Sequence, residues 1–381
     1  MDVFNKYVPI SLDECINVDD VEKLAFTKLT VNSLSYYYSG AGDEETLREN
    51  KLAFKRIRLS PRVLVDVSNV DTSCSIQGYK ISMPICFSPS ASHKLAHVDG
   101  EKASSSAANK LNTLFCLSSF SSILLEDVAV SNKNGLRWYQ LSIAKNREFT
   151  YNLIKRAENN GYKAILLTVD APILGSRERD QRVKFKLPDG ISYENFKNLV
   201  VKDRNQNSNI KESSNQLFNY FLDNMDPSVT WDIIKWIKSI TPLPLILKGV
   251  YRPDDALIAA EMGVNGLLIS NHGGRQLDTV LSGVEMLVPI AKALKSYKNI
   301  EIYVDGGIRR GVDIFKCLAL GAKAVFLGRP ILWGLVCGGE EGVKKVVDMI
   351  YNEFVICMKL SGCRTINEIT SDYVIENFSK F

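Results

Sequence analysis

Eight short apolar runs recur along the chain, and each ends in polar residues or glycine. Runs of about four to eight apolar residues with such ends are typical of strands that are buried on both faces of a parallel sheet. We therefore predict strands within the ranges 84–90, 113–119, 137–143, 164–170, 244–250, 266–273, 301–307 and 324–330.

Amphipathic stretches lie between these runs and carry helix boundary signals. The stretch 254–263 begins with Asp254 directly after Pro253 and ends at Gly263, so we predict a helix capped by Asp254. The stretch 313–321 repeats this scheme, with Asp313 at its start and Gly321 at its end. Alternation of strand and helix eight times predicts an α/β fold, a (β/α)8 TIM barrel.

One connection is much longer than the others. It follows the fourth predicted strand, and its middle, 203–216, is polar and low in complexity. Such a segment buries little apolar surface, so we predict a mobile insertion at about 176–230 that extends over the active-site face. A helix at 230–240 would return the chain to the barrel, with Thr230 as its N-cap and Ile233, Ile234 and Ile237 on its inner face.

The remaining segments fit a single domain that spans 1–381. The barrel with its insertion would occupy 81–340, and 341–381 would form a C-terminal helical segment and tail. Residues 1–80 would be a helical and hairpin lead-in that closes the bottom of the barrel or covers its rim.

Composition narrows the class of protein. The hydrophobic content of 45% and charged content of 24% are ordinary for a soluble globular protein. The net charge of +4 is spread along the chain, so no nucleic-acid partner is indicated. No apolar run reaches membrane-spanning length, and the first residues lack a signal-peptide pattern.

The cysteine and histidine patterns do not predict a metal site. The eight cysteines are scattered without a C-x-x-C pair, which favours buried reduced thiols and a reducing compartment. His93 and His97 are four residues apart, but no third ligand lies nearby, so we interpret them as packing residues.

Polar residues gather where the predicted strands end, which is where barrels carry reactive groups. His272 follows the sixth strand, with Arg275 one short turn away. A base beside a fixed cation suits removal of a proton from a small anionic substrate. Asp170 ends the fourth strand and would stabilise the imidazolium that proton uptake creates.

The last two strands end in glycine followed by arginine, a pattern that suits a phosphate group. Gly306 and Gly307 precede Arg309, and Gly328 precedes Arg329. Backbone N–H groups at these two strand ends commonly hold phosphate in barrels, and the arginines would add bidentate contacts. Lys248 ends the fifth strand, where it either extends to solvent or stabilises negative charge.

Several segments carry a family resemblance that covers essentially the whole chain. The chain resembles the FMN-dependent (S)-2-hydroxy-acid oxidases, the glycolate oxidase family. The segments that carry it are Tyr-Tyr-Tyr-Ser-Gly-Ala at 36–41, Ala-His-Val-Asp-Gly-Glu at 96–101, Leu-Thr-Val-Asp at 167–170, Leu-Lys-Gly-Val at 247–250, Ser-Asn-His-Gly-Gly-Arg-Gln-Leu-Asp at 270–278, Val-Asp-Gly-Gly-Ile-Arg-Arg-Gly at 304–311 and Leu-Gly-Arg-Pro at 327–330.

This resemblance implies a role for each matched residue. His272 matches the active-site base, Asp170 its carboxylate partner, and Lys248 the lysine beside the flavin ring, where negative charge collects. The substrate-binding residues would be Tyr36, Arg177, Arg275 and Ser142, together with His272. The FMN contacts would be Pro89, Ser90, Ala91, Ser118, Gln140, Thr168, Lys248, Ser270, Asp305, Gly306, Gly307, Arg309, Gly328 and Arg329.

Two positions depart from the family's pattern. Ser142 stands where the family has a second substrate-facing tyrosine, and Phe120 stands where short-chain glycolate oxidases have tryptophan. Loss of one charge-assisted hydrogen bond costs on the order of 1.5–3 kcal/mol, or roughly tenfold to a hundredfold in rate. Both changes also enlarge the pocket, so we expect a 2-hydroxy acid bulkier than glycolate.

The resemblance implies oxidation of an (S)-2-hydroxy acid by O2, with a 2-oxo acid and H2O2 as products. One alternative is a dehydrogenase that uses another electron acceptor, which we disfavour because no haem domain precedes residue 30 and the insertion lacks a membrane-binding apolar stretch. Another is a flavin-binding homologue of low activity. The resemblance also implies a homotetramer or larger homo-oligomer, and the terminal Ser379-Lys380-Phe381 suggests a peroxisomal location ahead of a cytoplasmic one.

Overall fold

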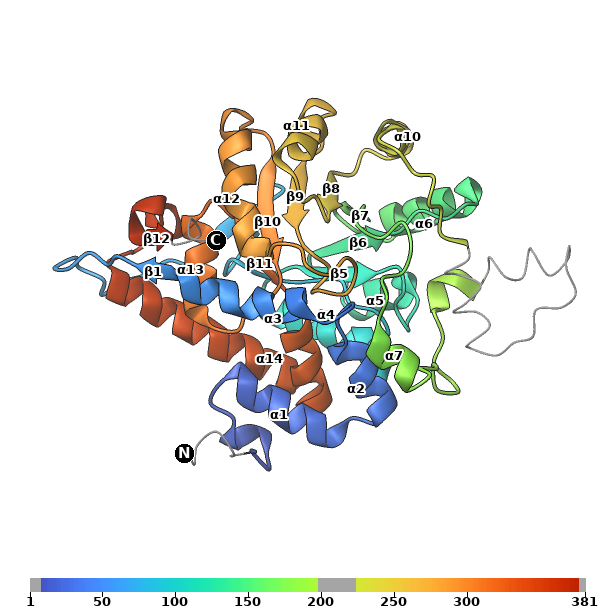
Figure 1. The fold of residues 1–381 in the computed structure, drawn as a ribbon, viewed down its shortest axis with the longest axis horizontal. Coiled ribbons are helices and arrows are strands. Elements are labelled where there is room, and N and C mark those ends of the chain that lie inside the picture. Colours follow the sequence, from blue (N-terminus) through green and yellow to red (C-terminus); the bar gives the residue numbers. More distant parts are fainter. Residues whose placement is uncertain (1–7, 198–223, 377–381) are drawn as a thin grey trace, which may run out of the picture.

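Eight parallel strands close into a barrel in the computed structural model, which describes residues 8–197 and 224–376. The barrel order is β10-β11-β4-β5-β6-β7-β8-β9, so neighbours in the chain are neighbours in the sheet (Figure 1). Each strand lies inside a predicted range, which confirms the barrel. The strands are β4 (Ile85–Phe87), β5 (Phe115–Ser118), β6 (Arg137–Leu141), β7 (Ile165–Thr168), β8 (Leu245–Lys248), β9 (Gly266–Ile269), β10 (Glu301–Asp305) and β11 (Ala324–Leu327).

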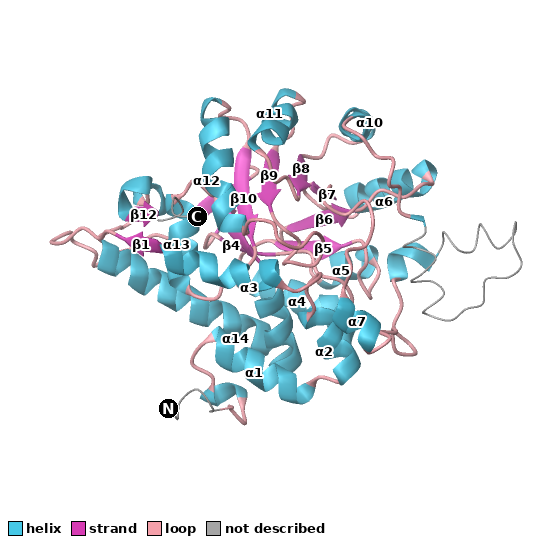
Figure 2. Cartoon of the chain, in the orientation of Figure 1, coloured by secondary structure: helices cyan, strands magenta, loops and turns pink. Residues whose placement is uncertain are grey.

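A helix layer surrounds the barrel and explains why the strands are apolar on both faces (Figure 2). Side chains alternate along each strand, so Leu268 points into the barrel while Leu267 and Ile269 pack against the helices. The helices that follow the strands are α4 (Gly100–Lys110), α5 (Leu125–Ser131), α6 (Arg147–Asn159), α10 (Asp232–Ile240), α11 (Pro253–Glu261), α12 (Gly283–Ala293), α13 (Gly311–Ala319) and α14 (Arg329–Ser361).

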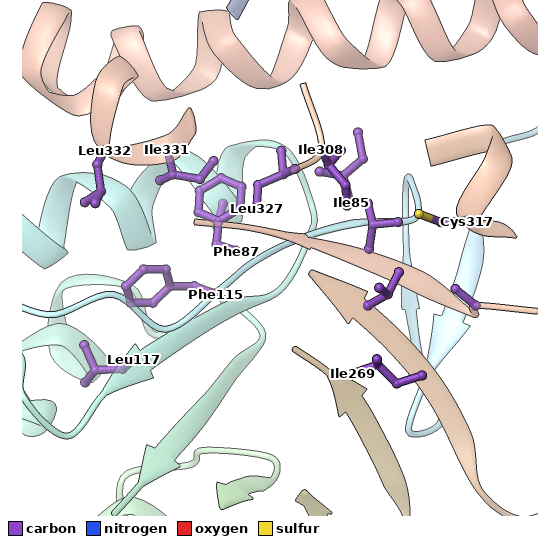
Figure 3. Close-up of a cluster of buried hydrophobic side chains, with 14 of the residues drawn as sticks. Ile85, Phe87, Phe115, Leu117, Ile269, Ile308, Cys317, Leu327, Ile331 and Leu332 are labelled. Carbon is purple, nitrogen blue, oxygen red and sulfur yellow. The ribbon is translucent and has the colours of Figure 1, made fainter. Parts of the chain in front are cut away.

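The outer core holds the strands and helices together. Figure 3 shows Phe87, Phe115 and Leu327 of the barrel beside Ile331 of α14. Phe87 and Phe115 meet edge to face, with ring centroids 6.4 Å apart. The interior is filled by large rings as well, because Trp138, Tyr303 and Phe326 pack against one another below the site.

Three predicted helix starts were wrong by one or two residues. Helix α10 begins after Trp231 rather than Thr230, although its predicted inner face of Ile233, Ile234 and Ile237 is buried as expected. Helix α11 begins at Pro253, where a missing N–H costs nothing, and the Asp254 carboxylate binds the Arg252 guanidinium instead of capping. Helix α13 begins at Gly311, but the Asp313 carboxylate still accepts the backbone N–H groups of Arg309 and Arg310, both at 3.0 Å.

The lead-in covers both ends of the barrel. The hairpin of β2 (Cys74–Ile76) and β3 (Tyr79–Ile81) closes the bottom, where the Gln77 side chain donates to the Asn265 carbonyl at 3.0 Å. Helices α1 (Val18–Lys28), α2 (Val31–Tyr38) and α3 (Glu45–Leu52) lie at the other end, and Tyr36 and Asn50 reach the cavity there. Residues of this N-terminal segment therefore contact both ends of the barrel.

The remaining elements tie the ends of the chain to this body. Strand β1 (Ile57–Leu59) pairs with β12 (Val374–Glu376), and α14 changes direction at Gly338 and Gly339. The part of the insertion that the structure describes contains α7 (Glu178–Arg182) and the short turn η5 (Glu194–Phe196). The predicted mobile stretch 203–216 lies outside the described residues.

Two predictions from composition can be compared with this fold. All eight cysteines are unpaired, and all but the half-buried Cys74 are buried, as expected for reduced thiols. None of the helices that the structure describes has the length and apolarity to cross a membrane.

Candidate active site

A single cavity at the carboxyl ends of the strands collects most of the predicted site residues. Residues from α2, α3, the strand ends and the insertion all line it. Two predicted residues lie behind its wall instead, namely Asp170 and Ser270. The predicted residues that line it are Tyr36, Pro89, Ser90, Ala91, Ser118, Gln140, Ser142, Thr168, Arg177, Lys248, His272, Arg275, Asp305, Gly306, Gly307, Arg309, Gly328 and Arg329.

His272 and Asp170 form a pair at the end of β7 and β9. The His272 Nδ1 atom lies 3.2 Å from both carboxylate oxygens of Asp170, whose side chain is only 2% exposed. The His272 backbone has a left-handed φ of 58°, and its N–H donates to the Ser270 hydroxyl at 3.0 Å. This turn leaves the other ring nitrogen on the cavity side, since Nδ1 is occupied by the carboxylate.

The electrostatic surroundings keep the imidazole neutral. Burial and the Lys248 ammonium lower the pKa of His272 to about 4, against an opposing effect of Asp170. Burial opposes ionisation of Asp170, but Lys248 and His272 outweigh it and keep the pKa of this carboxyl below its usual value. The pair is therefore a neutral base beside a fixed carboxylate, which suits acceptance of a proton.

The position of Lys248 decides between the two alternatives that the sequence left open, extension to solvent or stabilisation of negative charge. Its side chain does not extend to solvent, because the residue is 4% exposed. Its Nζ atom is buried and has no hydrogen-bond partner among the residues described. A buried ammonium without a partner is costly, so this position favours a ligand atom that carries negative charge or accepts a hydrogen bond.

Two further cations lie close together at the rim. The Arg177 Nε atom donates to the Arg275 carbonyl at 3.2 Å, and the Arg275 Nη1 atom donates to the Ser39 carbonyl at 2.8 Å. The Arg275 guanidinium also lies 5.3 Å from the centre of the Tyr36 ring. Burial and the neighbouring Arg275 lower the pKa of Arg177 to about 9, which an anion between the two would reverse.

The glycines at the end of β10 have a mainly steric role. Gly306 and Gly307 have φ of 93° and 80°, and a Cβ on Gly307 would lie 1.7 Å from the Asn50 carbonyl oxygen. The absence of a side chain therefore lets α3 approach the strand end. Gly328 differs, because the nearest atom to a Cβ there would be 3.8 Å away.

The two arginines of this region have different surroundings. Arg329 donates to the backbone carbonyls of Tyr37, Gly273 and Ser39 at 2.8–3.1 Å, so it joins α2 to the loop after β9. The Nε atom of Arg309 is buried without a hydrogen-bond partner among the described residues. Its Nη2 atom lies 3.6 Å from Glu22, so Arg309 still has capacity for an anion.

A hydrogen-bonded network crosses the floor of the cavity. The Gln140 carbonyl oxygen accepts the Ser118 hydroxyl at 3.1 Å, and its amide donates to Ser142 and Thr168, both at 3.0 Å. The Ser88 hydroxyl donates to Asp305 at 3.2 Å, and burial raises the pKa of Asp305. These groups present fixed donors and acceptors to a planar polar ligand.

Sequence reasoning missed several residues of the wall. Asn50 and Lys51 come from α3, Ile173 and Leu174 from the loop after β7, and Tyr193 and Met225 from the insertion. No local pattern distinguishes them, because they lie outside the strand ends and reach the cavity only through the fold. Phe120 lines the cavity too, but it packs edge to face with Tyr193.

A parallel barrel with a neutral histidine and several buried cations at the carboxyl ends of its strands is typical of an enzyme that acts on an anionic substrate. The chain belongs to the FMN-dependent dehydrogenase family, whose model matches residues 25–376. It is therefore an FMN-dependent oxidoreductase.

Individual relatives are similar over nearly their whole length. A peroxisomal (S)-2-hydroxyacid oxidase of Arabidopsis thaliana is 45% identical over 363 residues, which cover 95% of this chain and 97% of the relative. The 2-hydroxyacid oxidase 1 of Homo sapiens is 44% identical over 366 residues, with 96% and 98% coverage. A mandelate oxidase variant solved with (S)-mandelic acid has a TM-score of 0.83 at 33% identity, with 93% and 96% coverage.

A flavocytochrome b2 variant solved with pyruvate is also similar. Its TM-score is 0.84 at 36% identity, and the match covers 96% of this chain and 87% of that one. The relatives therefore include proteins that are named oxidases and one that is named a cytochrome.

Proposed function

We propose that this protein oxidises (S)-2-hydroxy acids to 2-oxo acids and passes the electrons to O2, with H2O2 as the second product. The observation that carries this proposal is the neutral His272, held by Asp170 and facing a cavity with two rim arginines. The names of the relatives support it, since they include (S)-2-hydroxyacid, L-lactate and mandelate oxidases.

Arg177 and Arg275 bind the substrate carboxylate in this proposal. They are the two rim cations beside His272 in the cavity, and a guanidinium binds a carboxylate through two parallel hydrogen bonds. Tyr36 lies under the Arg275 guanidinium and offers a hydroxyl to the same group. The substrate's hydroxyl-bearing carbon is then placed next to the imidazole.

His272 accepts a proton from the substrate. Its Nδ1 atom faces Asp170, so the proton goes to Nε2, the nitrogen that is left for the cavity. The buried carboxylate of Asp170 then stabilises the imidazolium. Because the pKa of His272 is about 4, the ring is ready to accept a proton at neutral pH.

The residues present fit FMN. When bound, FMN accepts two electrons from the substrate and later gives them to the final acceptor. The unpartnered Lys248 ammonium would offset negative charge on the ring, and Gln140, Ser118 and Thr168 would hydrogen-bond its polar edge. Arg309 has an unpartnered Nε atom for the phosphate, whereas Arg329 already binds three backbone carbonyls.

The preferred substrate carries an apolar side chain, which glycolate lacks. Ile173, Leu174 and Met225 line the cavity mouth, and Ile173 and Leu174 are 70% and 43% exposed. Substrate binding would bury part of this surface at about 25 cal/mol per Å². The short side chain of Ser142 enlarges the substrate cavity. The space beside Phe120, by contrast, is filled by Tyr193 and Phe196.

A second candidate is a dehydrogenase that gives its electrons to another acceptor. The relatives named oxidases favour the oxidase over this alternative, which we test because a flavocytochrome b2 variant is among the similar structures. The test is the visible spectrum of the yellow protein before and after anaerobic addition of lactate. Bleaching that reverses on exposure to air, with one H2O2 formed per lactate, is the expected result. Bleaching that reverses only with cytochrome c would favour the dehydrogenase, and no bleaching with any 2-hydroxy acid would refute both.

We also propose a peroxisomal location and assembly into a homotetramer or larger oligomer. A relative is peroxisomal by name, and the terminal Ser-Lys-Phe differs from the Ser-Lys-Leu address in one residue. That tripeptide lies outside the described residues. Import of a fusion protein with and without residues 379–381, and light scattering of the purified protein, would test the two proposals.

A further inference from the structure

The cavity contains a phenol that the family resemblance does not predict. The family resemblance implies a second substrate-facing tyrosine where this chain has Ser142, whose short side chain is bound by the Gln140 amide at 3.0 Å. Tyr193 comes from the insertion, between α7 and η5, and lines the same cavity. It is buried, with 1% of its surface exposed.

The neighbours of Tyr193 are the groups proposed to bind the substrate carboxylate. Tyr193 shares side-chain hydrogen bonds with Tyr36 and Ser92 and interacts electrostatically with Arg177. Two phenols and a guanidinium therefore lie near one another in the cavity wall. A carboxylate that docks on Arg177 and Tyr36 would come within reach of the Tyr193 hydroxyl.

The ring of Tyr193 stands at the end of a row of aromatic side chains. It meets Phe120 at 87°, with ring centroids 5.4 Å apart, and Phe120 in turn packs on Phe196 at 5.0 Å. Phe196 stacks on Phe149 of α6 at 5.5 Å. This aromatic row anchors the insertion to the barrel wall and fixes where the phenol points.

Hydrogen bonds from the backbone and side chains also join the same segment to the loop after β5. The Glu194 N–H donates to the Ser121 carbonyl at 3.2 Å, and the Asn195 amide donates to the Ser121 hydroxyl at 2.8 Å. The Asn195 side-chain oxygen Oδ1 accepts the Leu125 N–H at 3.0 Å. A side chain on a segment with so many anchors is preorganised, so binding to it costs little ordering entropy.

We propose that Tyr193 is a substrate-binding, specificity-determining residue, whose phenol donates a hydrogen bond to the substrate carboxylate in place of the one lost at Ser142. The assignment of the carboxylate site rests on the proposed function. On substrate entry the Tyr193 hydroxyl turns from Tyr36 to the carboxylate, and both phenols then share the anion with Arg177.

The consequence is that the insertion, rather than the end of β6, sets part of the specificity. Because the phenol comes from the insertion and not from the end of β6, the short side chain of Ser142 leaves room for the substrate's side chain. A carboxylate keeps its full set of donors while a longer 2-hydroxy acid is admitted. The Tyr193 hydroxyl would therefore compensate for the tyrosine that the family resemblance implies at position 142, while the other predicted substrate-binding residues are present.

The test is Tyr193→Phe in the FMN-loaded protein, because it removes only the hydroxyl and keeps the ring against Phe120. Binding of oxalate is followed by the change in the flavin spectrum, and kcat and KM are measured with 2-hydroxybutyrate. We expect oxalate to bind about tenfold to a hundredfold more weakly and kcat/KM to fall by a similar factor. Ser142→Tyr in the Tyr193→Phe background should recover at least part of the loss.

Tyr162→Phe is the matched control. Its hydroxyl is also buried and donates to the Leu125 carbonyl at 2.9 Å, but it does not line the cavity. This variant should leave oxalate binding unchanged. If Tyr193→Phe binds oxalate within twofold of wild type while retaining FMN and its melting temperature, the inference is wrong and Tyr193 is a packing residue.

A failure of the proposed function would look different. In that case wild-type protein would oxidise no 2-hydroxy acid, whereas oxalate binding would still report whether Tyr193 contacts a carboxylate. If Tyr193→Phe loses FMN, oxalate binding by Tyr193→Met reconstituted with excess FMN decides, since that side chain fills much of the space without a hydrogen-bond donor. Retained tight binding there would also overturn the inference.

Discussion

The three histidines of this chain show how surroundings decide what one side chain can do. His93 is buried, and its Nδ1 atom lies 2.9 Å from the Ser104 hydroxyl. His97 is half-buried beside Asp99, 3.5 Å away. His272 faces the cavity, with Asp170 behind it and Lys248 lowering its pKa. Position at a strand end, rather than residue type, gives His272 its chemistry.

His272→Gln should retain FMN and lower turnover of a 2-hydroxy acid by about 10²- to 10⁴-fold, because loss of a general base commonly has this effect. The measurement is kcat with H2O2 as readout. His97→Gln is the control, since His97 does not line the cavity, and it should turn over normally. Wild-type turnover in His272→Gln would mean that another group accepts the proton.

The pH profile should follow the ionisation of His272. The ring must be neutral to accept a proton, so kcat/KM should rise with pH through a pKa of about 4 and be level above it. Lys248→Met removes a cation that lowers this pKa, so the rise should move to higher pH. Lys235→Met, which removes an exposed cation of α10, should leave the profile unchanged. A profile that does not move in Lys248→Met would contradict this electrostatic assignment.

Ser142 should govern the preference for chain length. In wild type we expect kcat/KM to rise from glycolate to lactate to acids of four or more carbons, at about 0.8 kcal/mol for each buried methylene. Ser142→Tyr should fill this space and restore part of the activity with glycolate. A series of acids assayed with both proteins is the measurement. A wild type that is fastest with glycolate would show that other residues close the pocket.

At the scale of elements, the positions of the strands follow directly from local sequence, but the residues at which the helices begin do not. Each strand lies within its predicted range because burial on both faces leaves a continuous apolar run. Helix starts were less accurate, since Thr230 and Asp254 have capping side chains but lie one and two residues away from the N-cap positions. Local propensity cannot decide between adjacent positions when a proline or a tertiary contact fixes the first turn.

The junction of α3 with the end of β10 offers a test at this scale. Gly307→Ala would place a Cβ 1.7 Å from the Asn50 carbonyl oxygen, so α3 must move. Gly78→Ala is a matched control, because Gly78 has a similar φ of 81° but no atom within 4 Å of its Cβ. Thermal unfolding should show a loss of ~1–2 kcal/mol in the control from φ strain alone and a clearly larger loss in Gly307→Ala. Equal losses of unfolding free energy in the two variants would mean that α3 moves away from the new Cβ atom without a loss of stability.

At the scale of the whole molecule, FMN should act as a structural component. Lys248 and Arg309 have buried nitrogen atoms without hydrogen-bond partners among the described residues, and a bound anionic flavin would satisfy them. Protein stripped of FMN should therefore melt at a lower temperature. Added FMN at a hundred times its Kd should restore ~2.7 kcal/mol.

Riboflavin, which lacks the phosphate, is the informative comparison for this experiment. If Arg309 holds the phosphate, riboflavin should raise the melting temperature less than FMN at equal concentration. Equal stabilisation by the two compounds would mean that the phosphate contributes nothing and that the Gly-Arg pattern at the last strand ends was misinterpreted.

The amino-acid sequence by itself determined the barrel, the order of its strands and the residues at their ends. This was possible because the spacing of apolar residues and the residue types at turns can be read from short stretches of sequence. The placement of His272, Lys248 and Arg309 at one face followed from that, since the carboxyl ends of all barrel strands meet there. Named roles such as that of Arg177 needed the family resemblance as well.

The tertiary structure decided what depends on approach between distant segments. Only the fold brings Tyr193 of the insertion to Tyr36 of α2, and only the fold commits Arg329 to three carbonyls while Arg309 keeps an unpartnered Nε atom. It also shows that Gly307 makes room for α3. No local pattern encodes such contacts, because they are set by how whole elements pack.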